Sequence, residues 1–107
     1  MNDQRVEQLK QLLEQDPQDA FCRYALGLEL AGSTIHQEEA LQVFMDLLKD
    51  QPDYLPVYYQ LGQLYKNKGM TEDALEVVER GMEIALQQGN RHTFSELEFL
   101  KDELLDQ

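Results

Sequence analysis

The sequence contains few of the residues that would cross-link it or interrupt its helices. Its single cysteine, Cys22, cannot form an internal disulfide, and it lies in an apolar stretch without a flanking base, which favours a structural thiol over a nucleophile. Only three prolines and six glycines occur in 107 residues, and good helix formers dominate the rest. The sequence therefore predicts an all-α chain of about one domain.

Basic residues are also scarce. Nine Lys and Arg face 21 Asp and Glu, which gives a formal net charge of −12. Because binding to nucleic acid needs clustered Lys and Arg, we expect no nucleic-acid partner. The acidic excess has a plain interpretation, solubility, and two sharper ones, which are preference for a basic partner and mimicry of a polyanion that acts as a decoy.

Long apolar runs are absent as well. No run approaches the roughly 18 residues that a membrane-spanning helix requires. The first ten residues, MNDQRVEQLK, lack the apolar core of a secretion signal. We therefore expect a cytoplasmic protein without a membrane partner.

The residues that carry catalysis or bind metals show no matching pattern. His36 and His92 lie more than fifty residues apart, and we interpret each as a surface residue. Ser33 and Ser95 lack a nucleophile-elbow context, and neither a Gly-rich phosphate loop nor an acidic calcium loop is found. We expect no enzymatic activity, no metal and no cofactor.

Turn-forming residues divide the chain into stretches of similar length. They lie at Asp16-Pro17, Gly32-Ser33, Gln51-Pro52, Lys68-Gly69 and Gly89-Asn90. Each stretch between them has apolar residues at helical spacing. The sequence predicts six helices, at residues 3–15, 18–31, 35–50, 53–68, 71–88 and 91–106.

Residues near the helix starts suggest how three of these helices are capped. Asp16 is predicted to accept hydrogen bonds from the second helix, with Pro17 at its first position. Thr34 and Gln37 have the spacing of a capping box, and Thr71 precedes two acidic residues that suit a helix N-terminus.

Several residues recur at an interval of about 35, which indicates a duplication. The pairs that are 34 or 35 residues apart are Pro17 and Pro52, Leu26-Gly27 and Leu61-Gly62, and Ala40 and Ala74.

This period and these residue types resemble the tetratricopeptide repeat, a helix-turn-helix unit of about 34 residues with a W-x2-L-G-x2-Y, A-x3-F and P pattern. The second copy reads Tyr58-x2-Leu61-Gly62-x2-Tyr65, then Ala74-x3-Val78. The first copy reads Arg23-x2-Leu26-Gly27-x2-Leu30, then Ala40-x3-Phe44, and closes with Pro52. The resemblance implies a single domain, residues 1–107, folded as a right-handed α-α superhelix. Its predicted parts are a half repeat at 3–15, full repeats at 18–52 and 53–88, and a capping helix at 91–106.

The repeat pattern also predicts how the helices pack. Gly62 removes a side chain where two helices must approach closely, although glycine costs roughly 1 kcal/mol relative to alanine in a helix. Phe94, Leu97, Leu100 and Leu104 form a stripe that can cover the second copy. The sequence departs from the family pattern at several points: Arg23 replaces an aromatic, Gly81 replaces the preferred alanine, and Leu86 stands where a closing proline would. The turn between Gly27 and Ala40 is also one residue longer than the turn between Gly62 and Ala74.

In this family the inner helices line a concave groove that receives a segment of another protein. By resemblance, the groove positions here are Phe21, Tyr24, Leu28 and Ala31, then Pro56, Tyr59, Gln63 and Lys66. Lys66 supplies the only cation among them, which argues against capture of a terminal carboxylate. We therefore expect a small non-catalytic adaptor that binds an apolar or basic segment. The alternative is a self-associating structural subunit whose inner face is buried in a homodimer.

Overall fold

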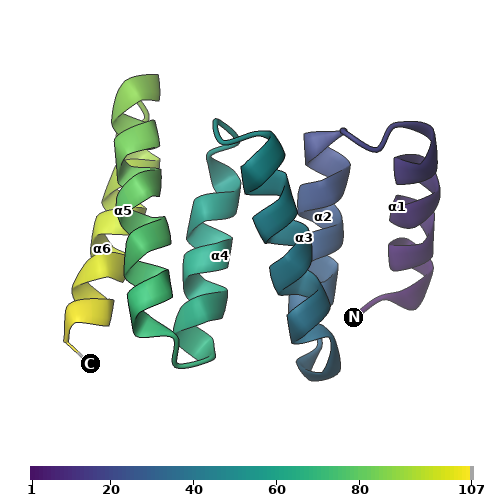
Figure 1. The fold of residues 1–107 in the computed structure, drawn as a ribbon, viewed down its shortest axis with the longest axis horizontal. Helices are drawn as coiled ribbons and strands as arrows, with labels where there is room; N and C mark the ends of the chain where they lie inside the picture. Colours follow the sequence, from purple (N-terminus) through teal and green to yellow (C-terminus); the bar gives the residue numbers. More distant parts are fainter. Residues whose placement is uncertain (107) are drawn as a thin grey trace. The chain divides into compact units, whose positions relative to one another are not determined.

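In the computed structural model, the described part of the chain, residues 1–106, consists of helices and connecting turns without a β-strand (Figure 1). The helices are α1 (Asp3–Gln15), α2 (Ala20–Ala31), η1, a short 3-10 helix (Thr34–His36), α3 (Gln37–Asp50), α4 (Pro56–Asn67), α5 (Thr71–Gln88) and α6 (Arg91–Leu105). The predicted all-α class and six α-helices are confirmed within these residues. The bounds of α1 and α5 match the prediction, whereas α2, α3 and α4 begin two or three residues later than expected.

The chain forms two compact units, which we call the N-terminal unit, Met1–Tyr54, and the C-terminal unit, which begins at Leu55. In the N-terminal unit, α2 contacts both α1 and α3. Gly27 allows the close approach of α2 and α3, since a Cβ atom there would lie only 2.3 Å from Cε1 of the buried Phe44. The helix α1 adds Val6 and Leu9 to this core.

In the C-terminal unit, α4, α5 and α6 each contact the other two helices. A Cβ atom on Gly62 would lie 2.7 Å from Cγ2 of Val78, which confirms that this glycine permits close packing of α4 against α5. A Cβ atom on Gly81 would lie 2.6 Å from Cβ of Tyr58. Glycine therefore replaces alanine at position 81 because the fully buried tyrosine needs the space.

The stripe on α6 covers this unit as the sequence predicts. Leu97, Leu100 and Leu104 are buried. Leu97 lies beside Gly81 and Leu100 beside Gly62. Phe94, the fourth member of the stripe, remains partly exposed.

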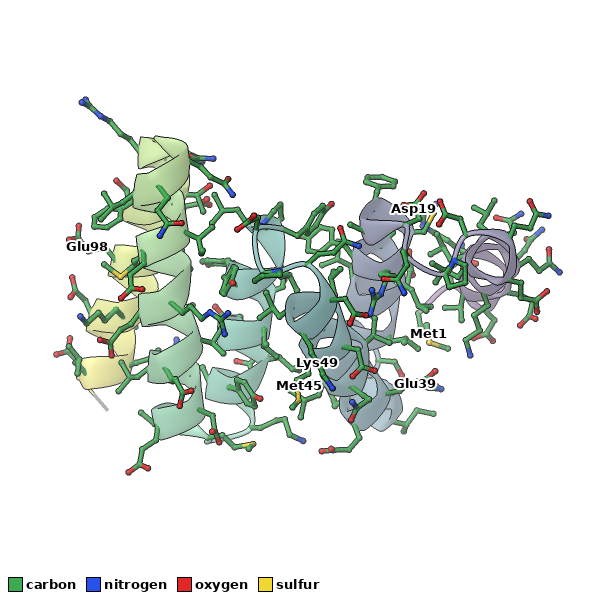
Figure 2. All side chains as sticks on the ribbon, turned by 45° about the horizontal axis from the view of Figure 1, so that its top comes forward. Met1, Asp19, Glu39, Met45, Lys49 and Glu98 are labelled. Atoms are coloured by element: carbon green, nitrogen blue, oxygen red, sulfur yellow. The ribbon has the colours of Figure 1, made fainter. Side chains whose placement is uncertain are left out.

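The predicted cap of α2 is wrong. Oδ1 of Asp19, not of Asp16, accepts the hydrogen bond from the Cys22 amide at 2.9 Å, and Figure 2 shows Asp19 at the start of this helix. The Asp16 amide instead bonds to the Leu12 carbonyl at 3.1 Å, so Asp16 ends α1. Pro17 therefore lies in the turn between the two helices rather than in the first turn of α2.

The predicted capping box of Thr34 and Gln37 is also wrong. Gln37 does not form a capping box with Thr34, because its Nε2 donates to the carbonyls of Ala31 at 2.7 Å and Ser33 at 2.8 Å. These bonds satisfy carbonyls at the end of α2 and beyond it. At α5 the prediction is confirmed, because Thr71 is the first helical residue and Glu72 and Asp73 lie in the first turn.

Two glycines end the helices of the C-terminal unit. Gly69 and Gly89 have φ angles of 75° and 68°, in the left-handed region that favours glycine. After each turn, the next amide bonds back to the helix, from Met70 to the Tyr65 carbonyl and from Asn90 to the Ala85 carbonyl, both at 2.9 Å.

Candidate partner-binding surface

The four predicted positions on α2 lie at spacings of three and four residues, so they follow one side of that helix. Phe21 is 66% exposed and Leu28 is 38% exposed, whereas Tyr24 and Ala31 are partly buried. The structure thus brings these residues together as a largely apolar strip on the N-terminal unit. We call Phe21, Tyr24, Leu28 and Ala31 the α2 strip. Their role in binding stays a prediction.

Two other aromatic rings hold Tyr24 in place. Its ring centroid lies 6.2 Å from that of Phe44 on α3 and 5.7 Å from that of Tyr54, both in tilted arrangements. Tyr54, in the connection after α3, therefore extends the aromatic surface beside the α2 strip. The sequence analysis missed Tyr54, because it placed this residue in the first turn of the helix predicted at 53–68 and outside the groove positions, whereas the structure begins α4 at Pro56 and leaves Tyr54 in the connection before it.

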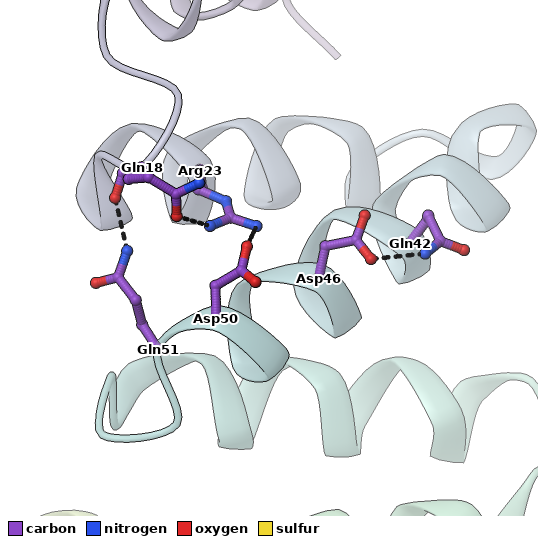
Figure 3. Close-up of polar contacts among 6 residues, drawn as sticks. All are labelled: Gln18, Arg23, Gln42, Asp46, Asp50 and Gln51. Atoms are coloured by element: carbon purple, nitrogen blue, oxygen red, sulfur yellow. Dashed lines mark hydrogen bonds and ion pairs between the residues drawn. The ribbon is translucent and has the colours of Figure 1, made fainter.

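Polar contacts tie the end of α3 to the start of α2 beside this surface (Figure 3). Nη2 of Arg23 lies 2.9 Å from Oδ2 of Asp50, and Nη1 donates to Oε1 of Gln18 at 3.3 Å. Nε2 of Gln51 donates to the Gln18 carbonyl at 2.6 Å. The Arg23 side chain is only 11% exposed, so the residue that replaces the family aromatic is largely buried and its guanidinium is held by a carboxylate.

A hollow of about 410 Å³ adjoins these contacts. Its lining is the stretch Asp50, Gln51, Pro52, Asp53 and Tyr54. Two acidic residues and Tyr54 thus belong to the stretch that lines this hollow, and the Tyr54 ring also lies against that of Tyr24.

The start of α2 lies in a negative electrostatic environment. Burial raises the pKa of the Cys22 thiol, and the carboxylates of Asp19 and Asp16 raise it further. Burial also raises the pKa of Tyr54, and Asp19 adds to that rise. The same carboxylate thus disfavours ionisation of a thiol and of a phenol, which is the effect expected from local negative charge.

The four predicted positions on α4 form a matching strip in the C-terminal unit, but its polar members already have partners. We call Pro56, Tyr59, Gln63 and Lys66 the α4 strip. Nε2 of Gln63 donates to Oδ1 of Asn67 at 3.3 Å, and Nζ of Lys66 lies 3.4 Å from Oε2 of Glu103 on α6. Pro56 is exposed and Tyr59 is partly buried. Lys66, the only cation among the predicted groove positions, is therefore already in an ion pair within its own unit.

A second hollow, of about 400 Å³, lies between the end of α5 and the start of α6. It is lined by Ala85, Leu86, Gly89, Asn90, Arg91, Phe94, Ser95 and Glu98. Figure 2 shows Glu98 projecting outward from α6. Leu86 in this hollow is 67% exposed, which makes it a matched control for Phe21 in the experiments below.

The other side chains that could titrate or bind a metal are not gathered in one place. Nε2 of His92 lies 3.5 Å from Oε1 of Glu96 one helical turn away, a pairing visible in the sequence that our interpretation of His92 left out. Within residues 1–106, no three His, Cys, Asp or Glu side chains are grouped as they would be around a metal ion. No helix in that part of the chain combines the length and the apolarity needed to cross a membrane.

Comparison with known proteins identifies the fold and the family. A family model described as the tetratricopeptide repeat matches residues 43–76. The solution NMR structure of a tetratricopeptide repeat domain protein from Salinibacter ruber is 37% identical to the chain, with a TM-score of 0.78, over 83% of this chain and 89% of that one. The chain belongs to the tetratricopeptide repeat family. Tetratricopeptide repeats are protein-interaction modules and are generally not catalytic.

Two more distant structures share the fold. A protein from Bordetella parapertussis is 24% identical, with a TM-score of 0.80, over 94% of this chain and 87% of that one. The TPR2B domain of yeast Sti1, in a complex with pHsp70, is 16% identical, with a TM-score of 0.86, over 94% of this chain and 80% of that one. A search of curated protein sequences finds no match.

Proposed function

We propose that this tetratricopeptide repeat chain is an adaptor that binds a segment of another protein through the α2 and α4 strips. The observation that carries the proposal is the exposure of Phe21 and Leu28 on the same side of α2 as Tyr24. Full burial of such a side chain contributes about 1.5–3 kcal/mol, so a partner that covers Phe21 gains a substantial part of that energy.

The family supports a protein partner. Tetratricopeptide repeats act as protein-interaction modules, and the TPR2B domain of yeast Sti1, which shares the fold, forms a complex with pHsp70. The two strips differ in chemistry, because the α2 strip is apolar whereas Gln63 and Lys66 of the α4 strip are already bonded within their own unit. We therefore assign the apolar anchor to α2 and expect weaker, polar contacts at α4.

The ion pair of Lys66 disfavours a partner that is recognised by its terminal carboxylate. Such a group would have to compete with Glu103, whose oxygen lies 3.4 Å from Nζ. An internal segment of the partner is the better fit. With two inner helices available, the contact falls at the small end of protein interfaces, and an affinity in the micromolar range is expected.

Burial of the inner face against a second copy is disfavoured by charge. Each copy carries a net charge of −12, and Asp19, Asp50 and Asp53 lie near Tyr54, whose ring packs on that of Tyr24 in the α2 strip. Pairing these surfaces would bring like charges together in a partly desolvated contact. The adaptor function is therefore favoured over the homodimer.

A selection from a random peptide library tests the proposal, because it does not require the natural partner to be identified. Peptides of about twelve residues that are enriched on the wild-type chain would be labelled, and their binding would be measured by fluorescence anisotropy. Loss of the Phe21 contact in Phe21→Ala should weaken binding about 5- to 30-fold, since about 1–2 kcal/mol of apolar burial is removed.

Three further measurements serve as comparisons. Tyr59→Ala should weaken binding by a smaller factor, whereas Leu86→Ala, which removes an equally exposed apolar side chain, should leave it unchanged. Far-UV circular dichroism should show an intact fold in each variant. Peptides that bind Phe21→Ala and Tyr59→Ala as tightly as the wild type would refute the proposed surface.

A further inference from the structure

We propose that the end of the C-terminal unit formed by α5 and α6 binds a second copy of the chain, as a weak dimer with twofold symmetry. The contact surface is the hollow of about 400 Å³ whose lining includes Leu86, Arg91, Phe94, Ser95 and Glu98. None of these residues belongs to the α2 strip or the α4 strip, so this association goes beyond the proposed function and does not depend on it.

Two apolar side chains of this end remain in contact with solvent. Leu86 is 67% exposed, and Phe94 is partly exposed although the other members of its stripe on α6 are buried. Leu86 comes from α5 and Phe94 from α6, and both line the same hollow. They therefore form one apolar patch whose burial against a further apolar surface would be favourable.

Two side chains of opposite charge flank this patch. Arg91 and Glu98 are seven residues apart on α6, so they lie on the same side of the helix, about 10.5 Å apart along its axis. Both are exposed, and neither has an ion-pair partner among residues 1–106. Lys101 of the same helix, by contrast, pairs with Glu79 at 3.9 Å. The hollow thus offers one unpaired charge of each sign.

This arrangement of charges is self-complementary. If a second copy of α6 packs antiparallel to the first, with the twofold axis between Phe94 and Ser95, Arg91 of each copy lies opposite Glu98 of the other. Phe94 of each copy then lies opposite the small side chain of Ser95, which leaves room for the ring. An unrelated helix would need an acid and a base at this same spacing. Charge complementarity therefore selects a second copy as the occupant.

The dimer should be weak. Standard protein interfaces use about 20–30 residues a side, whereas this hollow is lined by eight residues of each copy. The net charge of −12 also opposes association, although at 0.15 M salt charges more than about 8 Å apart are largely screened. We expect a dissociation constant of some hundreds of micromolar, so that the chain remains single at tens of micromolar.

Charge reversal combined with sedimentation equilibrium tests the pairing, at about 0.05 to 2 mM chain in 0.15 M salt. Arg91→Glu and Glu98→Arg each bring like charges together at two places in the dimer, so each should weaken it at least about 10-fold. The double variant, Arg91→Glu with Glu98→Arg, restores both ion pairs in reversed order. It should therefore dimerise within about threefold of the wild type.

An equimolar mixture of the two single variants gives a result that a folding defect cannot imitate. One chain then carries two acids at positions 91 and 98, and the other carries two bases, so the two pair with each other. The mixture should associate at least as tightly as the wild type, although neither variant dimerises by itself. A wild type that stays single up to 2 mM, or a mixture that does not associate, would overturn the inference.

Three control variants locate the contact, each with far-UV circular dichroism as a check of the fold. Arg80→Glu makes the same charge change at an exposed residue of α5 outside the hollow and should leave association within about threefold of the wild type. Leu86→Ala should weaken association about fivefold or more, because the side chain is lost from both copies. Phe21→Ala should have no effect.

Two patterns among these controls would contradict the assignment. Equal weakening by Arg80→Glu and Arg91→Glu would mean that only net charge matters. A dimer that is lost in Phe21→Ala but kept in Arg91→Glu would be the homodimer through the inner face instead.

Discussion

Replacement of Gly27 by alanine should destabilise the N-terminal unit, although alanine is the better helix former. A Cβ atom on residue 27 would lie 2.3, 2.7 and 2.8 Å from three ring atoms of Phe44, whereas carbon atoms in contact normally lie about 3.5–4.0 Å apart. The Phe44 ring has no exposed surface, so it would have to shift by about 1 Å against packed neighbours.

The net effect is the difference of two contributions. Overpacking a well-packed core costs typically 1–3 kcal/mol, and three overlaps below 3.0 Å with a fully buried ring place Gly27→Ala in the upper part of that range, at about 2–3 kcal/mol. Removal of glycine from a helix interior returns roughly 1 kcal/mol. We expect Gly27→Ala to lower the free energy of unfolding by about 1–2 kcal/mol and the urea midpoint by about 0.5–1 M.

A matched substitution at the end of the same helix should have no such cost. At Gly32 the φ angle is −72°, and the atom nearest to a new Cβ would be the Glu29 carbonyl oxygen at 3.4 Å, an ordinary contact. Gly32→Ala should therefore be neutral or stabilise the fold by up to about 1 kcal/mol.

Urea unfolding followed by far-UV circular dichroism measures both variants. Phe44→Leu shortens the ring side chain that a Cβ atom at residue 27 would meet, so the cost of Gly27→Ala should be smaller in that background. If Gly27→Ala is as stable as the wild type, or if its cost is unchanged by Phe44→Leu, the inferred close approach of α2 and α3 is incorrect.

Three further predictions concern caps, pH and association. Asp19→Ala should lower stability by about 1 kcal/mol through loss of the bond to the Cys22 amide, whereas Asp16→Ala should cost less; the reverse order in urea unfolding would favour Asp16 as the cap. Because folding raises the pKa of Cys22 from its ordinary 9.0 and also raises the pKa of Tyr54, their contribution to stability is present at neutral pH. This contribution should be lost as pH rises from about 9 to 11, so the urea midpoint of the wild type should fall over this range, and that of Cys22→Ser should fall less. A wild-type urea midpoint that does not fall would contradict the prediction. Sedimentation equilibrium should give the mass of one chain up to tens of micromolar, and a concentration-dependent dimer would favour the homodimer instead.

The sequence predicted the elements and their close contacts better than it predicted their ends. Apolar periodicity located six helices, and the recurring glycines correctly marked where α2 meets α3 and α4 meets α5. These features are visible because they depend on side-chain size and spacing along one helix. Asp16 and Asp19 have the same capping chemistry, so the choice between them depends on the path of the turn, which local sequence does not specify.

The candidate surface was predicted only in part. The α2 strip follows from the repeat pattern, because its members share one side of a helix. Tyr54 was missed because it reaches Tyr24 across a tertiary contact from outside any helix. The ion pair between Lys66 and Glu103 was equally hidden, since the two residues meet only when α6 packs on α4. The features of the surface that the repeat pattern did not predict therefore depend on contacts between elements rather than on spacing within one helix.

Chemical-shift mapping tests the central claim most directly. A selected peptide would be titrated into the ¹⁵N-labelled chain, and amide shifts would be followed along every helix. We predict that the largest shifts fall on residues 19–31 and 50–54, with smaller shifts on α4, and that Phe21→Ala abolishes them at the same peptide concentration. Largest shifts around the hollow that contains Leu86, or an unchanged response in Phe21→Ala, would contradict the account.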